Sequence, residues 1–279
     1  MHHKNLRARR SMTVACLALG LGGHATIATA EESDDTYDEH AVDEIVVEGI
    51  PLDRTIKELA QPASIIGGDE LAKRQAASIG ETLAHELGVS STYFGPVASR
   101  PVIRGQYGER IRVLANALDA MDASALSEDH AVSVDSMLAE RIEIIRGPAT
   151  LLYGSGAAGG LVNVVDNRIH ENGLDSPFGG RVIFGTDAAT GREAIAAEVA
   201  AGADNIAVHL DYFRRDTDDI EIPGFAESAR LRALEEDEEG EEHEEEEAFG
   251  VVENTSSEAE GGAAALTLTG DNGFVGVSV

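Results

Sequence analysis

A polar stretch near the middle of the chain carries side chains of the types that commonly bind metal ions. It spans residues 121–130 and ends in the adjacent pair Asp129-His130. Carboxylate and imidazole together suit zinc, and also manganese, nickel or copper. A plainer interpretation is a polar loop in which Asp129 or Ser133 caps a helix over residues 134–138. The residues alone leave both interpretations open.

A second candidate for cation binding is the acidic run over residues 235–247. Eleven of its thirteen residues are Asp or Glu, and His243 lies between Glu242 and Glu244. Most runs of this kind are solvated segments without compact structure. A histidine among carboxylates also predicts weak collection of divalent cations.

Composition limits the classes of partner and site. The net charge is −30, which disfavours nucleic acid and favours cations. The one cysteine, Cys16, lies in the N-terminal segment described next, so a mature chain has neither disulfides nor thiolate ligands, and any metal must be held by nitrogen and oxygen. We find no paired acid and base, activated nucleophile or phosphate loop followed by Lys, and therefore expect no enzymatic activity.

The first thirty residues have the pattern of a secretory signal peptide. Residues 2–10 are basic, residues 12–21 are apolar, and Ala28-Thr29-Ala30 is a small-x-small cleavage site. The apolar run is too short to span a membrane as a helix. Residues 31–51 are predicted to be a tether.

The most strongly patterned stretch is Arg141–Val165. Residues 141–145 alternate charged and branched side chains, which predicts a half-buried strand that Gly147-Pro148 ends. Residues 161–165 predict a second strand. The glycines between the strands allow close packing or positive φ, and they are Gly154, Gly156, Gly159 and Gly160.

This stretch, which reads IEIIRGPATLLYGSGAAGGLVN, resembles the end of the plug domain of TonB-dependent outer-membrane receptors. Residues 100–105 and 110–114 match two further plug elements, although Asn116-Ala117 stands where the family usually has Asp-Gly. The resemblance implies an α+β plug domain, a small mixed sheet with short helices, over residues 52–170. It implies that residues 171–279 are the first strands of a transmembrane antiparallel β-barrel that is incomplete in this chain.

The resemblance also implies a coupling segment and an interdomain contact. Its TonB box would be Asp43, Glu44, Ile45, Val46 and Val47, which in the family pairs as an added strand with the periplasmic protein TonB. By itself this segment could also be an edge strand. Arg104 and Arg146 resemble plug arginines that face barrel carboxylates, although they could equally be solvated charges.

Residues 124–132, SALSEDHAV, are similar to the zinc-uptake subfamily of these receptors. That similarity implies that Asp129 and His130 bind zinc at the plug apex, with zinc as transported ligand rather than catalytic cofactor. It implies a bacterial outer-membrane location in contact with lipid. The alternatives are another cargo (siderophore-iron, haem or copper) or a secreted acidic cation-binding or adhesion protein. Large organic cargoes favour aromatic plugs, and this chain is 4% aromatic.

Two helices are expected in the plug. Asp69 is predicted to cap a helix that runs through Gln75. Ser78 and Glu81 have capping-box spacing for a second helix, in which Leu83 and Leu87 form the inner face.

Strands are expected after the plug at residues 181–185, 193–201 and 206–215. In the last of these, Ile206, Val208, Leu210 and Tyr212 are predicted to face lipid, and Ala207, His209, Asp211 and Phe213 to face the lumen. His209 and Asp211 are interpreted as lumen polar groups rather than as ligands. Residues 222–261, which include the acidic run, are predicted to be an extracellular loop.

About 110 residues follow the plug, too few for the roughly 22 strands of a barrel of this family. We therefore expect a fragment or a truncated reading frame.

Overall fold

The computed structural model describes residues 46–49, 54–55, 58–59, 62–120, 123–147, 153–188, 190–232 and 248–279. The signal peptide, Asp43, Glu44, Ile45 and the whole acidic run with Glu242, His243 and Glu244 lie outside these residues.

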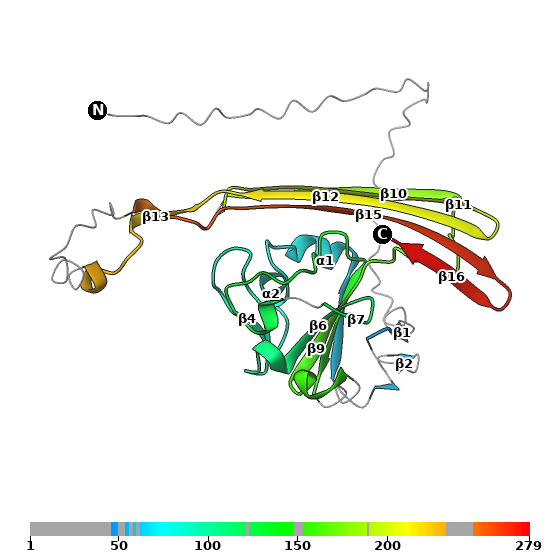
Figure 1. The fold of residues 1–279 in the computed structure, drawn as a ribbon, viewed down its shortest axis with the longest axis horizontal. Helices are drawn as coiled ribbons and strands as arrows, with labels where there is room; N and C mark the ends of the chain where they lie inside the picture. The colour runs from blue at the N-terminus through cyan, green and yellow to red at the C-terminus, as the bar shows by residue number, and fades with distance from the viewer. Residues whose placement is uncertain are drawn as a thin grey trace, which may run out of the picture. The chain divides into compact units, whose positions relative to one another are not determined.

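A five-stranded mixed sheet forms the centre of the predicted plug, in the order β3-β8-β9-β6-β7 (Figure 1). Its strands are β3 (Ala63–Gly67), β6 (Ile111–Ala115), β7 (Leu118–Asp119), β8 (Arg141–Arg146) and β9 (Gly160–Val165). β8 pairs antiparallel with β3 and β9, whereas β6 and β9 are parallel. Two short ladders accompany it: β1 (Val46–Val47) with β2 (Arg54–Thr55), and β4 (Val89–Ser91) with β5 (Pro101–Ile103).

The prediction of a half-buried strand at residues 141–145 is wrong, because both faces of β8 are covered. Ile142 and Ile144 belong to a core that also contains Leu71 and Leu83. On the other face, Ile145 packs with a second core that includes Val47, Leu114 and Leu161. The N-terminal segment therefore covers the face that was expected to meet solvent.

Gly160 lets β8 and β9 meet closely. Its φ is +156°, and a Cβ built there would lie 2.7 Å from the carbonyl oxygen of Ile145. Such a distance excludes any side chain without a backbone shift. This confirms the close packing that was predicted for the glycines between the two strands.

The helices differ from their predictions at their ends. α1 (Gly68–Arg74) begins after Gly67, with no side-chain cap, and Asp69 lies inside its first turn. α2 (Ile79–Leu83) begins as predicted, because the Ser78 hydroxyl accepts a hydrogen bond from the Glu81 amide. It ends too early for a four-residue periodicity to apply, so Leu83 is buried and Leu87 is 89% exposed.

Two local turns also depart from expectation. Asn116 and Ala117 both have positive φ, +49° and +61°, and they connect β6 to β7. Residues 134–138 form no helix, so neither Asp129 nor Ser133 is a helix cap. Instead, the Asp135 carboxylate accepts a hydrogen bond from the Met137 amide.

The strands after the plug form a separate antiparallel sheet, in the order β10-β11-β12-β15-β16 (Figure 1). They are β10 (Phe178–Asp187), β11 (Arg192–Ala203), β12 (Ile206–Thr217), β15 (Ser257–Gly270) and β16 (Gly273–Ser278). In Figure 1 this sheet is curved, as barrel strands require. All three predicted strands are confirmed, and each is longer than predicted.

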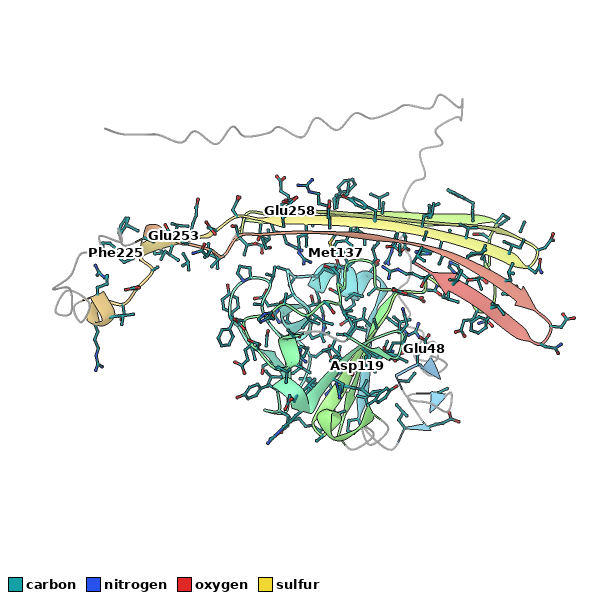
Figure 2. All side chains as sticks on the ribbon, viewed as in Figure 1. Glu48, Asp119, Met137, Phe225, Glu253 and Glu258 are labelled. Atoms are coloured by element: carbon teal, nitrogen blue, oxygen red, sulfur yellow. The ribbon has the colours of Figure 1, made fainter. Side chains whose placement is uncertain are left out.

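Alternation along β12 is as predicted. Ile206, Val208, Leu210 and Tyr212 are 40–48% exposed, whereas Ala207, His209 and Asp211 are at most 8% exposed. Exposed apolar side chains continue on the neighbouring strands, at Phe184, Leu266, Leu268 and Val275. This sheet thus has one apolar outer face and one inner face that meets the plug through Met137 and Leu138, packed on Ala194 and Ala196 (Figure 2).

The predicted loop over residues 222–261 is wrong at both ends. β13 (Ile220–Phe225) and β14 (Phe249–Val252) pair as an antiparallel hairpin, and β15 already begins at Ser257. Phe225 and Phe249 are stacked edge to face, with ring centroids 4.9 Å apart. The residues at the two ends of the predicted loop thus form strands, although the acidic composition of the loop favoured an irregular structure throughout. Within the described ranges, no helix is both long and apolar enough to cross a bilayer.

Candidate functional site

Asp129 and His130 lie together on an exposed loop between η4 (Ala123–Ala125) and β8. His130 Nδ1 is 2.9 Å from Asp129 Oδ1, and the side chains are 55% and 68% exposed respectively. The Ser127 hydroxyl donates to the same carboxylate oxygen. These two hydrogen bonds, from Ser127 first and then His130, lower the pKa of Asp129, so the carboxylate is ionised at neutral pH.

Zinc takes three or four protein ligands, and this pair could supply two of them. Among the residues that the structure describes, no group of three or more His, Cys, Asp or Glu side chains converges in metal-binding geometry. Since Asp129 and His130 are exposed and adjacent, they can present one oxygen and one nitrogen outward. Further ligands would have to come from elsewhere in the protein.

The residues directly after β1 contact a carboxylate that is completely buried. Glu143 of β8 is 0% exposed and accepts hydrogen bonds from the amides of Glu48, at 3.1 Å, and Gly49, at 2.8 Å. Asn163 Nδ2 and Arg141 Nε also donate to it, each at 3.1 Å. Buried charge is tolerated when it is satisfied in this way. Glu143 therefore holds the residues directly after Val47 on β8, an internal strand of the plug sheet.

Two further contacts tighten this attachment. Arg141 Nη2 lies 2.6 Å from the Glu48 carboxylate, which Figure 2 labels beside β1. A Cβ on Gly49 would lie 3.2 Å from both Glu143 and Asn163, which leaves little room for a side chain. We call Glu143, Arg141 and Asn163 the β8 clamp. Its central carboxylate was missed in the sequence because a charged residue in an alternating strand predicts a solvent-facing position.

Arg146 and Arg104 are placed differently from one another. Arg146 is 7% exposed and lies 3.8 Å from Glu86, also in the plug. Burial lowers the pKa of Arg146, whereas Glu86 opposes that shift. Arg104 is exposed, with a φ of +49° and its amide bonded to the Gly88 carbonyl. Their contact with barrel carboxylates stays a prediction.

The contacts between the plug and the strands come instead from residues that were not singled out. Arg215 Nη1 lies 2.8 Å from Asp135, and Arg181 Nη2 donates to the Leu138 and Ala139 carbonyls. Arg192 donates to the Gln75 carbonyl. Arg215 lies between Arg214 and Asp216, and Arg192 between Gly191 and Glu193, so the sequence offers no pattern that identifies these arginines.

A second histidine pair lies where the segment after β9 meets β12. The rings of His170 and His209 have centroids 5.6 Å apart. Arg168 holds Asp211 through two hydrogen bonds, of 2.7 and 3.2 Å. Burial, and then the neighbouring His209, lower the pKa of His170, so its imidazole is neutral at pH 7.

Comparison with known proteins agrees with this architecture. Residues 55–161 match the TonB-dependent Receptor Plug Domain family. The hemin receptor of Yersinia pestis is 29% identical over 154 residues, which are 54% of this chain and 22% of that protein. The vitamin B12 transporter BtuB of Photobacterium profundum is 33% identical over 129 residues, 46% of this chain and 21% of that protein. The chain thus spans about a fifth of the length of these relatives.

Solved structures show the same fold. The copper transporter OprC superposes with a TM-score of 0.57 at 19% identity, over 77% of this chain and 29% of that one. A mutant ferric enterobactin receptor from Pseudomonas aeruginosa gives a TM-score of 0.56 at 18% identity, over 80% of this chain and 33% of that one.

These relatives are receptors and transporters rather than enzymes, in agreement with the sequence, and another, from Escherichia coli, is described as an outer membrane transporter. The predicted fold class and bacterial outer-membrane location are confirmed. The plug-domain match, the receptor relatives and the fold together support the TonB-dependent receptor family for this chain.

Proposed function

We propose that this chain belongs to a TonB-dependent outer-membrane receptor that takes up zinc. The observation that carries the proposal is the contact between His130 and Asp129 on an exposed plug loop, with an ionised carboxylate and an imidazole side by side. Borderline cations such as zinc favour this mixture of nitrogen and oxygen ligands. The acidic run over residues 235–247 would raise the local cation concentration, with His243, Glu242 and Glu244 as weak ligands.

The β8 clamp suggests how energy coupling would reach the plug. In the proposed mechanism TonB pairs with residues 43–47 and pulls. Val47 of that segment is packed in the second core, and the residues directly after it are held by Glu143, whose strand lies between β3 and β9. Force on the segment would therefore act on an internal strand of the sheet rather than on an edge strand. Arg104 and Arg146 would hold the plug against barrel carboxylates during this pull.

Copper is a second cargo that the same ligands suit. Imidazole and carboxylate bind Cu²⁺ more tightly than Zn²⁺ in most sites of this kind. One structural relative is described as a copper transporter, whereas others are described as hemin or ferric enterobactin receptors. Organic cargoes are less favoured by this chain, because it is only 4% aromatic.

Uptake in cells tests the proposed cargo. Radioactive zinc uptake and growth under zinc limitation are compared in the parent strain, in a strain lacking the receptor gene, and in one complemented with Asp129→Ala/His130→Ala. We expect deletion to abolish high-affinity zinc uptake and the double variant to fail to restore it. Zinc uptake and growth unaffected by the deletion, with copper uptake lost instead, would assign the receptor to copper.

A further inference from the structure

The pair formed by His170 and His209 lies apart from the plug loop and plays no part in the function proposed above. His170 belongs to the segment that leaves the plug, and its amide donates to the Thr267 hydroxyl of β15 at 3.3 Å. His209 lies on the inner face of β12 and is 4% exposed. Elements far apart in the sequence thus bring two imidazoles together at the inner face of the sheet.

Both rings keep a buried nitrogen that has no hydrogen-bond partner. These atoms are His170 Nε2 and His209 Nδ1. Leaving a buried polar atom unsatisfied costs about 1–3 kcal/mol, so native proteins rarely do so without a ligand, water or function at that place. Two such atoms on neighbouring rings point to a shared ligand.

Asp211 determines which nitrogen of His209 is free. Its Oδ2 lies 3.3 Å from His209 Nε2, and Arg168 also donates to this carboxylate. A carboxylate that accepts from Arg favours the tautomer with the proton on Nε2, because a lone pair there would be repelled. Nδ1 then carries the lone pair. Metal-binding histidines are commonly oriented by a carboxylate in this way.

The separation of the rings fits one metal ion between them. Two imidazoles bound at about 2.0–2.1 Å to one tetrahedral Zn²⁺ have centroids about 5–6 Å apart. The observed separation is 5.6 Å, with the ring planes tilted by 44°. Ring pairs in plain aromatic contact also lie about 4.5–7 Å apart. The separation therefore permits both rings to bind one centre, and the two nitrogens without partners are what point to a ligand.

The surroundings leave room for a cation and favour its charge. A cavity of about 260 Å³ is lined by both histidines and by the carboxylates of Glu140, Asp166 and Glu198. The residues opposite His209 on the neighbouring strands are Ala200 and Ala265, whose small side chains do not fill this space. Arg181 pairs with Glu198 at 2.9 Å and Arg168 with Asp166 at 3.0 Å, whereas Glu140 lies 3.9 Å from its partner Arg141.

We propose that His170 Nε2 and His209 Nδ1 bind one borderline divalent cation, Zn²⁺ or Cu²⁺, with Asp211 orienting His209. Water completes the coordination. The bound metal would join the segment after the plug to the wall of β12. This assignment replaces the interpretation of His209 as only a lumen polar group.

The test uses the full chain in detergent with Asp129→Ala/His130→Ala as background, so that the plug loop cannot contribute. Zn²⁺ binding is followed by calorimetry, and backbone hydrogen exchange of residues 166–174 is measured with and without Zn²⁺. We expect His170→Gln and His209→Asn each to lose one zinc equivalent, or to weaken it at least about tenfold. In the background protein, Zn²⁺ should slow exchange of the segment, whereas in the variants it should not.

His85→Gln is the matched control, because His85 is an exposed plug histidine, and it should bind as the background does. A second measurement needs no variant. Cu²⁺ with ascorbate and peroxide should oxidise His170 or His209 in preference to His85, as detected by mass spectrometry. Unchanged zinc stoichiometry in both variants, or oxidation no greater than at His85, would overturn the proposal. Either result leaves the uptake experiment above unaffected.

Discussion

At the scale of single residues, Glu143 shows how a buried charge can attach one segment to another. Its two carboxylate oxygens receive four N–H donors, two of them from the main chain of residues 48–49. Hydrogen bonds to a charged acceptor contribute about 1.5–3 kcal/mol each when one partner is removed. Removal of this one carboxylate charge is therefore expected to weaken the attachment of residues 48–49.

Glu143→Gln should release this segment while preserving the shape of the side chain. One oxygen of Glu143 would be replaced by the NH₂ group of glutamine, which cannot accept a hydrogen bond from the N–H donors around it, so at least one hydrogen bond is lost. We expect hydrogen exchange at residues 48–49 to become about ten- to hundredfold faster. Amides of α1 should be unaffected, which separates local release from unfolding of the plug. Glu109→Gln, at an exposed plug site, is the control, and equal exchange in the two variants contradicts the clamp.

Ala117 has a backbone conformation that suits glycine. At φ +61° an L side chain costs about 1–2 kcal/mol, part of which the greater freedom of unfolded glycine offsets. Ala117→Gly should therefore raise the free energy of unfolding by about 0.5–1 kcal/mol in urea titrations of the full chain. Ala115→Gly, two residues earlier inside β6, should lower it by a similar amount. A loss of stability in Ala117→Gly would show that its methyl group has packing that outweighs the strain.

One of the two candidate metal sites could be predicted from the sequence alone. Asp129-His130 could be identified because both ligands are adjacent in sequence. His170 and His209 could not, because thirty-eight residues separate them and only the pairing of β12 with β15, to which His170 is bonded, brings them together.

At the scale of elements, α2 contains a carboxyl group whose protonation affects stability. Burial, and then the neighbouring Asp187, raise the pKa of Glu81 above its ordinary value of 4.5. Because the folded state holds the proton more tightly, stability from Glu81 is present below pH 4.5 and is lost as the pH rises through the raised pKa. Glu81→Gln should remove this decline. Urea titrations from pH 4 to pH 8 measure the free energy of unfolding of each protein. Glu70→Gln, at an exposed position of α1, is the control. Parallel curves of this free energy against pH for Glu81→Gln and the parent would contradict the assignment.

The outer face of β12 makes a prediction about lipid. Leu210 is 48% exposed and lies in an apolar row on that face. An arginine there would cost about 2–4 kcal/mol if the position lies at the bilayer midplane. Leu210→Arg should destabilise the protein by that amount in lipid vesicles, as measured by urea unfolding. Leu231→Arg, outside the five-stranded sheet, should have little effect. Equal effects would mean that β12 does not face the membrane interior.

A sequence pattern predicted the faces of a strand correctly only where no segment distant in the sequence covers the face that was expected to be exposed. Alternation predicted the faces of β12 correctly, because one face packs on the plug along the whole strand. The same rule failed for β8, where Glu143 and Ile145 are covered by residues from near the N-terminus. The prediction that Leu87 lies on the inner face of the second helix was wrong for a local reason. α2 is only five residues long, so Leu87, four residues after Leu83, lies beyond its end.

At the scale of the whole molecule, the plug and the strands are held together by polar contacts as well as by apolar packing. Arg215 with Asp135, Arg168 with Asp211, and Arg181 with plug carbonyls all cross the junction. The fold class was predictable from the sequence because the plug pattern is long and specific. The partners of these arginines could not be predicted from the sequence, because they depend on how the inner face of the sheet meets the plug.

The central claim is that Asp129 and His130 recognise the transported cation. It is tested most directly by zinc calorimetry on the full-length receptor, comparing the parent with Asp129→Ala and with His130→Ala. Asp69→Ala and His85→Ala are the controls, at exposed plug positions of the same residue types. We predict that each site variant loses at least about tenfold in zinc affinity for one equivalent, and that the controls lose none. Unchanged affinity in both Asp129→Ala and His130→Ala would contradict the claim.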